Sequence, residues 1–269
     1  MKQKRPTPVD IDVHTPNAAR IYDYVLGGKD NFAVDRQAAE KFLELAPELR
    51  LAAQENRAFL ARAVRFLVAE AGVRQLLDIG SGLPTRRNTH ELAHEVAPDA
   101  RVVYVDYDPV VIAHSRELLS GIDNATAIQA DVRRPAEILD QPKLRKLFDF
   151  DQPVALLLVG LLFLVDDDDD PAGIVAQLRE AMTPDSYLAL SHITGDGQRP
   201  EAVKRFREVF EQAREPMVPR THEQIRRFFD GFAFVDPGLV KVSEWRPDQP
   251  VATRGPGTGW LFAGVGRKT

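Results

Sequence analysis

The segment L-L-D-I-G-S-G-L-P-T, residues 76–85, constrains the fold of this chain more than any other stretch. Residues 75–79 are mostly apolar and are followed by a glycine, which is typical of a short buried strand. Gly80 and Gly82 allow a turn whose backbone can take positive φ and approach a ligand without a Cβ in the way. A strand followed by a glycine turn and a helix predicts a ligand site at the carboxyl edge of an open α/β sheet, with Asp78 at its mouth.

The glycine turn alone leaves the ligand open, because nicotinamide and flavin sites use a similar turn. The dinucleotide fingerprint G-x-G-x-x-G places its third glycine at position 85, where this sequence has Thr85. An acid two residues before the first glycine, here Asp78, is instead typical of the D-x-G-x-G turn of S-adenosylmethionine (SAM) methyltransferases. The third glycine of that pattern is replaced by Pro84. A tight turn that binds nothing is the remaining interpretation.

The chain after Gly72 alternates between strand and helix, which predicts a mostly parallel sheet. The expected strands span residues 75–79, 101–106, 125–130, 154–160, 187–193, 232–242 and 259–266. The expected helices span residues 87–96, 109–119, 137–147, 173–182, 200–213 and 221–229, with the five aspartates 166–170 capping the fourth of them. The pattern before Gly72 is helical, with a first helix capped by Thr15 and two more over residues 35–45 and 51–71. We therefore expect a helical extension over residues 1–72, and an α/β domain over residues 73–269.

The string Y-D-Y-V-L-G-G-K-D-N-F, from Tyr22 to Phe32, is unusual for a helix end. A helix end followed by a turn explains Gly27 and Gly28 but not the polar cluster around them. The alternative is a lid that folds over the carboxyl edge of the sheet and excludes water from the ligand site. The basic segment from Met1 to Pro8 is expected to fray.

Three acids end three consecutive expected strands on the same edge of the sheet: Asp78, Asp106 and Asp131. Asp106 is placed to accept hydrogen bonds from both ribose hydroxyls of an adenine cofactor. An acid at the position of Asp131 commonly accepts from the adenine amino group in SAM enzymes. Three acids with this spacing favour a nucleoside-containing cofactor over three unrelated helix caps.

Composition excludes several classes of protein. The 269 residues carry a formal net charge of −5, whereas a general nucleic-acid binder would show a basic face. The absence of cysteine excludes disulfides, thiolate metal sites and cysteine nucleophiles. The longest apolar stretch, residues 154–165, is shorter than the roughly 18 residues of a membrane-spanning helix. A cytoplasmic enzyme that acts on a small molecule is the expectation.

Three further features suggest chemistry. His90 and His94 in H-E-L-A-H match the zinc-protease motif H-E-x-x-H, but the motif has only three fixed residues and needs a third ligand, for which Glu117 is the nearest candidate acid downstream, so no metal site is predicted. The acid run at residues 166–170 is interpreted as a solvated helix start. His192, at the end of the fifth expected strand, is the candidate catalytic residue, because it should face the ligand edge as a base or a substrate-orienting group.

The sequence resembles a bacterial family of SAM-dependent methyltransferases long catalogued as a domain of unknown function, and the resemblance covers nearly the whole chain. Its most specific parts are the string from Tyr22 to Phe32 and the ending L-P-T of the glycine turn, which accounts for Pro84. The other motifs that carry it are N-R-A-F-L at Asn56, N-T-H-E at Asn88, V-V-Y-V-D-Y-D-P-V-V at Val102, P-V-A-L-L-L-V at Pro153, L-S-H at Leu190 and F-F-D-G-F at Phe228.

The resemblance implies a class I methyltransferase: a Rossmann-like, seven-stranded sheet with an antiparallel last strand and an N-terminal helical cap. The cofactor residues expected from it and from the motifs are Asp78, Gly80, Ser81, Gly82, Asp106, Tyr107, Asp131, Val132, Tyr22, Gly28 and Asn31. Leu162 stands where the family often has a histidine, which leaves the activity of this member open. The predicted function is methyl transfer from SAM to a small molecule. The alternatives are a SAM-binding sensor without activity and a nicotinamide-dependent oxidoreductase.

Overall fold

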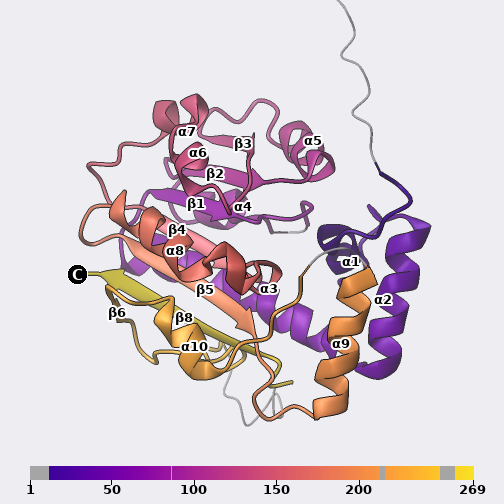
Figure 1. Cartoon of the computed structure of the whole chain (residues 1–269). Helices are drawn as coiled ribbons and strands as arrows, with labels where there is room; N and C mark the ends of the chain where they lie inside the picture. Colours follow the sequence, from indigo (N-terminus) through magenta and orange to yellow (C-terminus); the bar gives the residue numbers. More distant parts are fainter. Residues whose placement is uncertain (1–11, 86, 213–215, 249–257) are drawn as a thin grey trace, which may run out of the picture.

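A mixed sheet forms the centre of the computed structural model, which describes residues 12–85, 87–212, 216–248 and 258–269 (Figure 1). The strand order is β3-β2-β1-β4-β5-β8-β6, and β7 pairs with β8. The strands are β1 (Gln75–Ile79), β2 (Arg101–Asp106), β3 (Ala125–Gln129), β4 (Ala155–Val159), β5 (Tyr187–Ile193), β6 (Phe232–Phe234), β7 (Val240–Lys241) and β8 (Leu261–Lys268). Strands β3, β2, β1, β4 and β5 are parallel, whereas β8 runs antiparallel to β5, β6 and β7. The predicted class I fold is confirmed, with the two-residue β7 as an additional strand.

Helices pack on both faces of this sheet. They are α1 (Ala18–Val25), α2 (Ala33–Leu45), α3 (Leu49–Arg65), α4 (Thr89–His94), α5 (Pro109–Leu118), α6 (Pro135–Leu139), α7 (Pro142–Leu147), α8 (Pro171–Glu180), α9 (Pro200–Gln212) and α10 (His222–Arg227), together with a π-helical turn (Phe66–Glu70) and two 3-10 turns (Leu162–Leu164 and Asp167–Asp169). Helices α1, α2 and α9 lie side by side at the right of Figure 1. Within the described ranges, every helix is too short or too polar to cross a bilayer.

The first helix begins later than the sequence predicts. Asp12 Oδ1 accepts the backbone N–H groups of His14 and Thr15, at 2.8 and 3.0 Å, and so turns the chain at the predicted cap. Asn17 is the N-cap instead, because its side-chain oxygen accepts the N–H groups at the start of α1.

Proline accounts for two other differences from the predicted elements. The helix expected over residues 137–147 is two short helices, because Pro142 has no N–H to continue the first and begins the second. The strand expected over residues 232–242 is interrupted at Pro237 and forms β6 and β7. Asp170, in the acid run, caps α8 as expected by accepting the N–H of Gly173 at 3.0 Å.

The sheet separates two hydrophobic clusters. Leu76, Val102 and Leu157 point into the cluster that holds α1, α3 and α4, whereas Leu77 and Val103 point into the cluster that holds α8 and α10. Side chains of a strand alternate between faces, so residues of even number in β1 and β2 share the face covered by α3. The helices expected as an N-terminal extension therefore share a hydrophobic core with the sheet.

Parts of three sequence expectations lie outside the described residues. They are the segment from Met1 to Pro8, which is expected to fray, the last residue of the helix expected over residues 200–213, and most of the connection between the last two expected strands.

Candidate functional site

A cavity opens at the carboxyl ends of β1, β2 and β4, beneath α1 and α3. Its lining comes from the glycine turn, from the residues that end or follow β2, β3 and β4, and from the two covering helices. The lining residues expected from the sequence are Asp78, Gly80, Ser81, Gly82, Asp106, Tyr107, Val132 and Tyr22. The structure therefore brings together eight of the predicted cofactor residues, which are far apart in the sequence.

The glycine turn is held against β2 by its backbone. Gly80 and Gly82 take φ values of 71° and 66°, and the Gly80 N–H donates to the Val105 carbonyl at 2.8 Å. A Cβ at Gly80 would lie 2.5 Å from Leu161 Cδ1, whereas a Cβ at Gly82 would meet nothing within 4 Å. The positive φ of Gly80 favours glycine, and Leu161 packs closely against it, whereas the turn at Gly82 stays open toward the cavity.

Ser81, between the two glycines, has a buried hydroxyl group. Its Oγ has no hydrogen-bond partner among the described residues. A buried hydroxyl without a partner costs free energy, so Ser81 is a candidate hydrogen-bond partner for a ligand once its hydroxyl turns toward the cavity.

Two carboxylates face the cavity from the same side of the sheet. Asp78 accepts a hydrogen bond from Thr89 Oγ1 at 2.6 Å. Asp106 accepts the N–H groups of Gly82 and Asp108, each at 3.0 Å. Burial raises the pKa of both Asp78 and Asp106 to about 6. Both acids are therefore ionised at neutral pH but poorly solvated, which prepares them to accept hydrogen bonds from a ligand.

These two raised pKa values predict that stability depends on pH. The pKa is about 6 in the fold and 3.8 ordinarily, so the native state binds more protons than the unfolded state between about pH 4 and pH 6. Stability from these groups is thus present below pH 4 and lost as the pH rises through 6, by at most about 3 kcal/mol per carboxyl. Urea unfolding should show this fall in the native chain and a smaller fall in the Asp78→Asn/Asp106→Asn double variant. The same pH dependence in both proteins would contradict the prediction.

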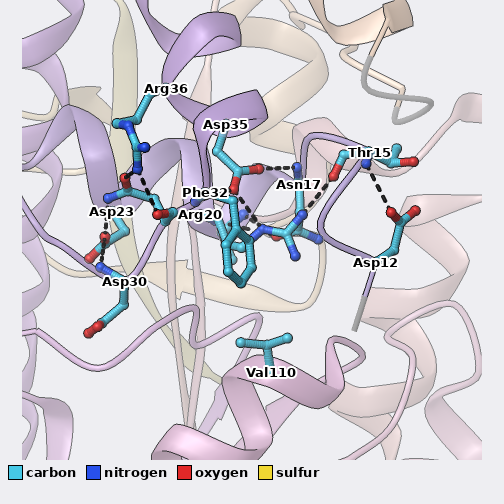
Figure 2. A network of polar contacts seen from close by, with 12 residues as sticks. Asp12, Thr15, Asn17, Arg20, Asp23, Asp30, Phe32, Asp35, Arg36 and Val110 are labelled. Carbon is cyan, nitrogen blue, oxygen red and sulfur yellow. Dashed lines mark hydrogen bonds and ion pairs between the residues drawn. The ribbon is translucent and has the colours of Figure 1, made fainter. Parts of the chain in front are cut away.

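Three of the predicted cofactor residues do not line the cavity. Gly28 and Asn31 belong to a loop built around Asp23, as Figure 2 shows for Asp23 and its neighbours. The Asp23 carboxylate accepts from Asp30 N at 2.9 Å and from Asn31 Nδ2 at 2.8 Å. A Cβ at Gly28 would lie 1.9 Å from Asp23 Oδ1, so glycine is needed there to make room for the carboxylate.

Asp131 is the third predicted residue outside the lining. Its carboxylate receives hydrogen bonds from Arg133 Nε and Nη2 and from the Arg133 backbone N–H. Val132, the next residue, lines the cavity in its place. The pairing of Asp131 with Arg133 could not be predicted from the sequence, because an arginine two residues away can either bind the acid or extend into solvent.

The placement of His192 differs from the prediction. Ile193 lines the cavity and Ser191 points to the same side, so His192 lies on the opposite face of β5, stacked on Phe228. Its Nε2 accepts from Arg220 Nη1 at 3.0 Å, and its Nδ1 donates to the Ile193 carbonyl at 2.7 Å. Burial lowers the pKa of His192 to about 3, so the ring is neutral. The imidazole is fully buried on the far face, and it is not placed to act on a ligand in the cavity.

The two histidines of the H-E-L-A-H motif have protein partners. His90 Nδ1 lies 2.7 Å from the Tyr104 hydroxyl, and His94 Nε2 lies 2.9 Å from the Ala100 carbonyl. Among the described residues, no group of three or more His, Asp or Glu side chains is arranged to hold a metal ion.

Two polar residues of α3, Asn56 and Arg57, line the cavity without having been assigned a role from the sequence. Arg57 Nη2 donates to Thr85 Oγ1 at 2.6 Å, so its guanidinium lies beside the glycine turn. Asn56 accepts from Ser191 Oγ on β5 at 2.5 Å. The signal was present in the motif N-R-A-F-L, where two polar residues interrupt an apolar helix face.

Comparison with known proteins gives the same fold over the whole chain. The profile of a family described as S-adenosyl methyltransferase matches residues 4–269. A duf574-family protein from Streptomyces avermitilis has a solved structure with TM-score 0.92 and 40% identity, covering 96% of this chain and 99% of that one. The solved structure of a protein from Thermobifida fusca has TM-score 0.90 and 45% identity, covering 95% of this chain and 96% of that one. No curated protein matches the sequence.

A more distant structure shares the fold alone. Human N-acetylserotonin methyltransferase in complex with SAM has TM-score 0.50 and 13% identity, over 92% of this chain and 62% of that one.

Proposed function

This chain belongs to the S-adenosyl methyltransferase family, and on that premise we propose that its cavity binds SAM and a small-molecule acceptor side by side. The chain is a SAM-dependent methyltransferase, and the residues that hold SAM are the subject of the proposal. The observation that carries it is the convergence of the open glycine turn, the unpartnered Ser81 hydroxyl and the two buried acids on one cavity. The net charge of −5 supports a small molecule over a nucleic acid as the substrate.

SAM, when bound, supplies a methyl group on a sulfonium that transfers to a nucleophile by in-line displacement. The residues of the chain have to position the two reactants and exclude water. Positioning of this kind supplies roughly 7–11 kcal/mol of a barrier.

We assign the adenosine part to the ends of β2 and β3. Asp106 is the acceptor for the ribose hydroxyls, because its carboxylate is ionised at neutral pH, largely buried, and part of the cavity lining. Tyr107 and Val132 form the walls for adenine. This assignment replaces the predicted contact from Asp131, whose oxygens are taken by Arg133.

We assign the amino-acid part to the glycine turn. Asp78 is the partner for the ammonium group, and Arg57 is the partner for the carboxylate. The distance of 2.6 Å from Arg57 Nη2 to Thr85 Oγ1 supports this, because it holds the guanidinium at the turn. An arginine fork suits a carboxylate better than any other side chain does.

We propose that residues 15–32, which include α1, act as a lid, and that the string from Tyr22 to Phe32 is the signature of the family. Tyr22 lines the cavity, and Asn17 Nδ2 donates to the Tyr107 hydroxyl at 3.3 Å across its mouth. The Asp23 loop fixes the far end of α1. Such a lid excludes water from the reacting groups.

Calorimetric titration tests the cofactor assignment. SAM and S-adenosylhomocysteine are expected to bind, and NAD is not. A diphosphate needs free backbone N–H groups at the turn, but Pro84 has none and the Thr85 N–H donates to Asn88 Oδ1 at 2.9 Å. The Asp78 carboxylate would also repel a diphosphate. Binding of NAD as tight as that of SAM would overturn the proposed function.

A further inference from the structure

The end of the cavity away from the glycine turn is apolar. Ile21 and Val25 of α1, Leu49 and Leu60 of α3, and Phe163 and Ile193 from the sheet side line it. These side chains offer an acceptor molecule a hydrophobic surface, and burial of its apolar area against them favours binding.

The charged groups of the cavity are gathered at its other end. Among the described lining residues, the charged side chains are Arg57, Asp78 and Asp106. Arg57 contacts Thr85 of the glycine turn, and Asp106 accepts the N–H of Gly82 in the same turn. The proposed function gives all three to SAM. A charged acceptor would therefore lose its hydration at the apolar end without gaining a partner of opposite charge.

One polar chain crosses the apolar end. Ser191 Oγ donates to Asn56 Oδ1 at 2.5 Å, Asn56 Nδ2 donates to the Tyr22 hydroxyl at 3.2 Å, and Tyr22 donates to the Ala53 carbonyl at 3.1 Å. Because the Tyr22 hydroxyl gives its proton to the Ala53 carbonyl, it can only accept from Asn56, which places Asn56 Nδ2 toward Tyr22 and Oδ1 toward Ser191. Among the residues that the structure describes, one N–H of Asn56 and one lone pair of the Tyr22 oxygen have no partner.

Asn56 also lies where the two ends of the cavity meet. A Cβ at Gly160, directly after β4, would lie 2.9 Å from Asn56 Nδ2. The next residue, Leu161, packs against Gly80 of the glycine turn. The Asn56 amide is thus beside the backbone that joins the cofactor end to the apolar end.

We propose that the acceptor is an uncharged, mainly apolar molecule whose single polar group is held by the Asn56 amide and the Tyr22 hydroxyl, with Ser191 positioning the amide. This inference rests on the proposed function, because it assigns the charged end of the cavity to SAM. The ligand class would be a neutral phenol or alcohol, or a similar hydroxylated ring.

Three probes with the same ring test the class of acceptor: 2-naphthol, 2-naphthoate and 2-naphthylmethylammonium. Each is titrated by calorimetry into the full chain saturated with S-adenosylhomocysteine at neutral pH. The neutral naphthol is expected to bind at least about tenfold more tightly than either ion. Equal or tighter binding of an ion, or no binding of any probe, overturns the inference. Failure of S-adenosylhomocysteine itself to bind overturns the proposed function instead.

Two matched pairs of variants test the polar chain. Asn56→Leu is compared with Gln75→Leu, which removes another buried amide at the opposite end of β1, where Gln75 Nε2 donates to the Asp149 carbonyl. Ser191→Ala is compared with Ser186→Ala, which removes a fully buried hydroxyl that accepts from Val154 N. If Asn56→Leu fails to fold, the comparison of Ser191→Ala with Ser186→Ala still tests the polar chain.

Asn56→Leu should weaken naphthol binding about tenfold, the loss of one hydrogen bond, and leave the affinity for S-adenosylhomocysteine within about twofold. Ser191→Ala should weaken naphthol binding by a smaller factor, and neither control variant should change it. Equal losses for naphthol and S-adenosylhomocysteine would make Asn56 a cofactor residue and overturn the inference. If Ser191→Ala and Ser186→Ala change the affinity for naphthol equally, the proposal that Ser191 positions the Asn56 amide is overturned.

Discussion

Replacing Asp106 is expected to weaken SAM binding about tenfold in Asp106→Asn and up to about a hundredfold in Asp106→Ala. Hydrogen bonds to a charged acceptor are worth roughly 1.5–3 kcal/mol each, and 1.4 kcal/mol corresponds to a tenfold change in affinity. Asparagine keeps the shape of the side chain and one acceptor oxygen, whereas alanine removes both carboxylate oxygens. The buried carboxylate should bind the ribose because its own hydration is already lost in the fold.

Asp106→Asn should weaken SAM binding but raise the stability of the ligand-free protein. The pKa of Asp106, raised to about 6 by burial, means that its ionised form is unfavourable in the ligand-free fold at neutral pH. Asp106→Asn removes that charge but turns its NH2 group toward one of the two backbone N–H groups that the carboxylate accepts, so the net gain for the ligand-free protein in urea unfolding should be about 1 kcal/mol. Weaker binding together with a more stable fold would separate a binding role from a packing defect.

Asp131→Asn is the matched control, because Asp131 also ends a predicted strand but pairs with Arg133 outside the cavity. Its effect on SAM affinity, measured by calorimetry, is expected to stay within about twofold. If Asp131→Asn lost as much SAM affinity as Asp106→Asn, the contact between Asp131 and adenine that the sequence predicts would be supported after all. An unchanged dissociation constant in Asp106→Ala would remove Asp106 from the site.

Asp35→Ala is expected to cost about 3–5 kcal/mol of stability, the largest effect foreseen outside the sheet. Figure 2 shows Asp35 between Asn17, Arg20 and Phe32. The Asp35 carboxylate accepts Arg20 Nε at 2.9 Å, Asn17 N at 2.9 Å and Phe32 N at 2.8 Å. The exposed fractions of the Arg20 and Asp35 side chains are 4% and 0%. Removing the acid leaves a buried guanidinium without its counter-charge.

The loss should begin in the lid, because Asn17 and Phe32 lie at the two ends of residues 15–32 and both donate to Asp35. Urea unfolding measures the total loss of stability. In hydrogen exchange, Asp35→Ala should speed up the exchange of the lid amides more than that of the amides in β1 and β4. SAM should slow this exchange in the native chain. Glu44→Gln, at an exposed position in the same helix, is the control and should change stability by less than about 0.5 kcal/mol. A cost below about 1 kcal/mol for Asp35→Ala would show that the ion pair does not hold the lid.

The sequence predicted the elements whose signals are local. The apolar run before Gly80, the two glycines and the acids at the ends of the next strands depend on neighbours within a few residues. Such patterns define a strand, a turn and a strand end without the rest of the chain. Asp78, Gly80, Gly82 and Asp106 were therefore found, and the structure places them together at the cavity.

The sequence also contained signals that fit more than one structure. The string from Tyr22 to Phe32 was recognised as unusual. Two of its predicted cofactor residues, Gly28 and Asn31, instead build the loop around Asp23. Of the three cofactor residues predicted from the string, Tyr22 is the one that lines the cavity. Nothing in the string distinguishes a side chain that builds a loop from one that touches a ligand.

The order of strands and helices, the glycine turn and the acids beside it could be predicted from the sequence, because each follows from the periodicity and conformational freedom of consecutive residues. Which face of β5 borders the cavity could not be predicted in this way. Alternation places Ser191 and His192 on opposite faces but does not say which face α3 covers. The bond from Ser191 to Asn56 joins residues 135 positions apart, and so depends on how a helix packs across a sheet. Packing of that kind is set by the shapes of both surfaces, which no local pattern contains.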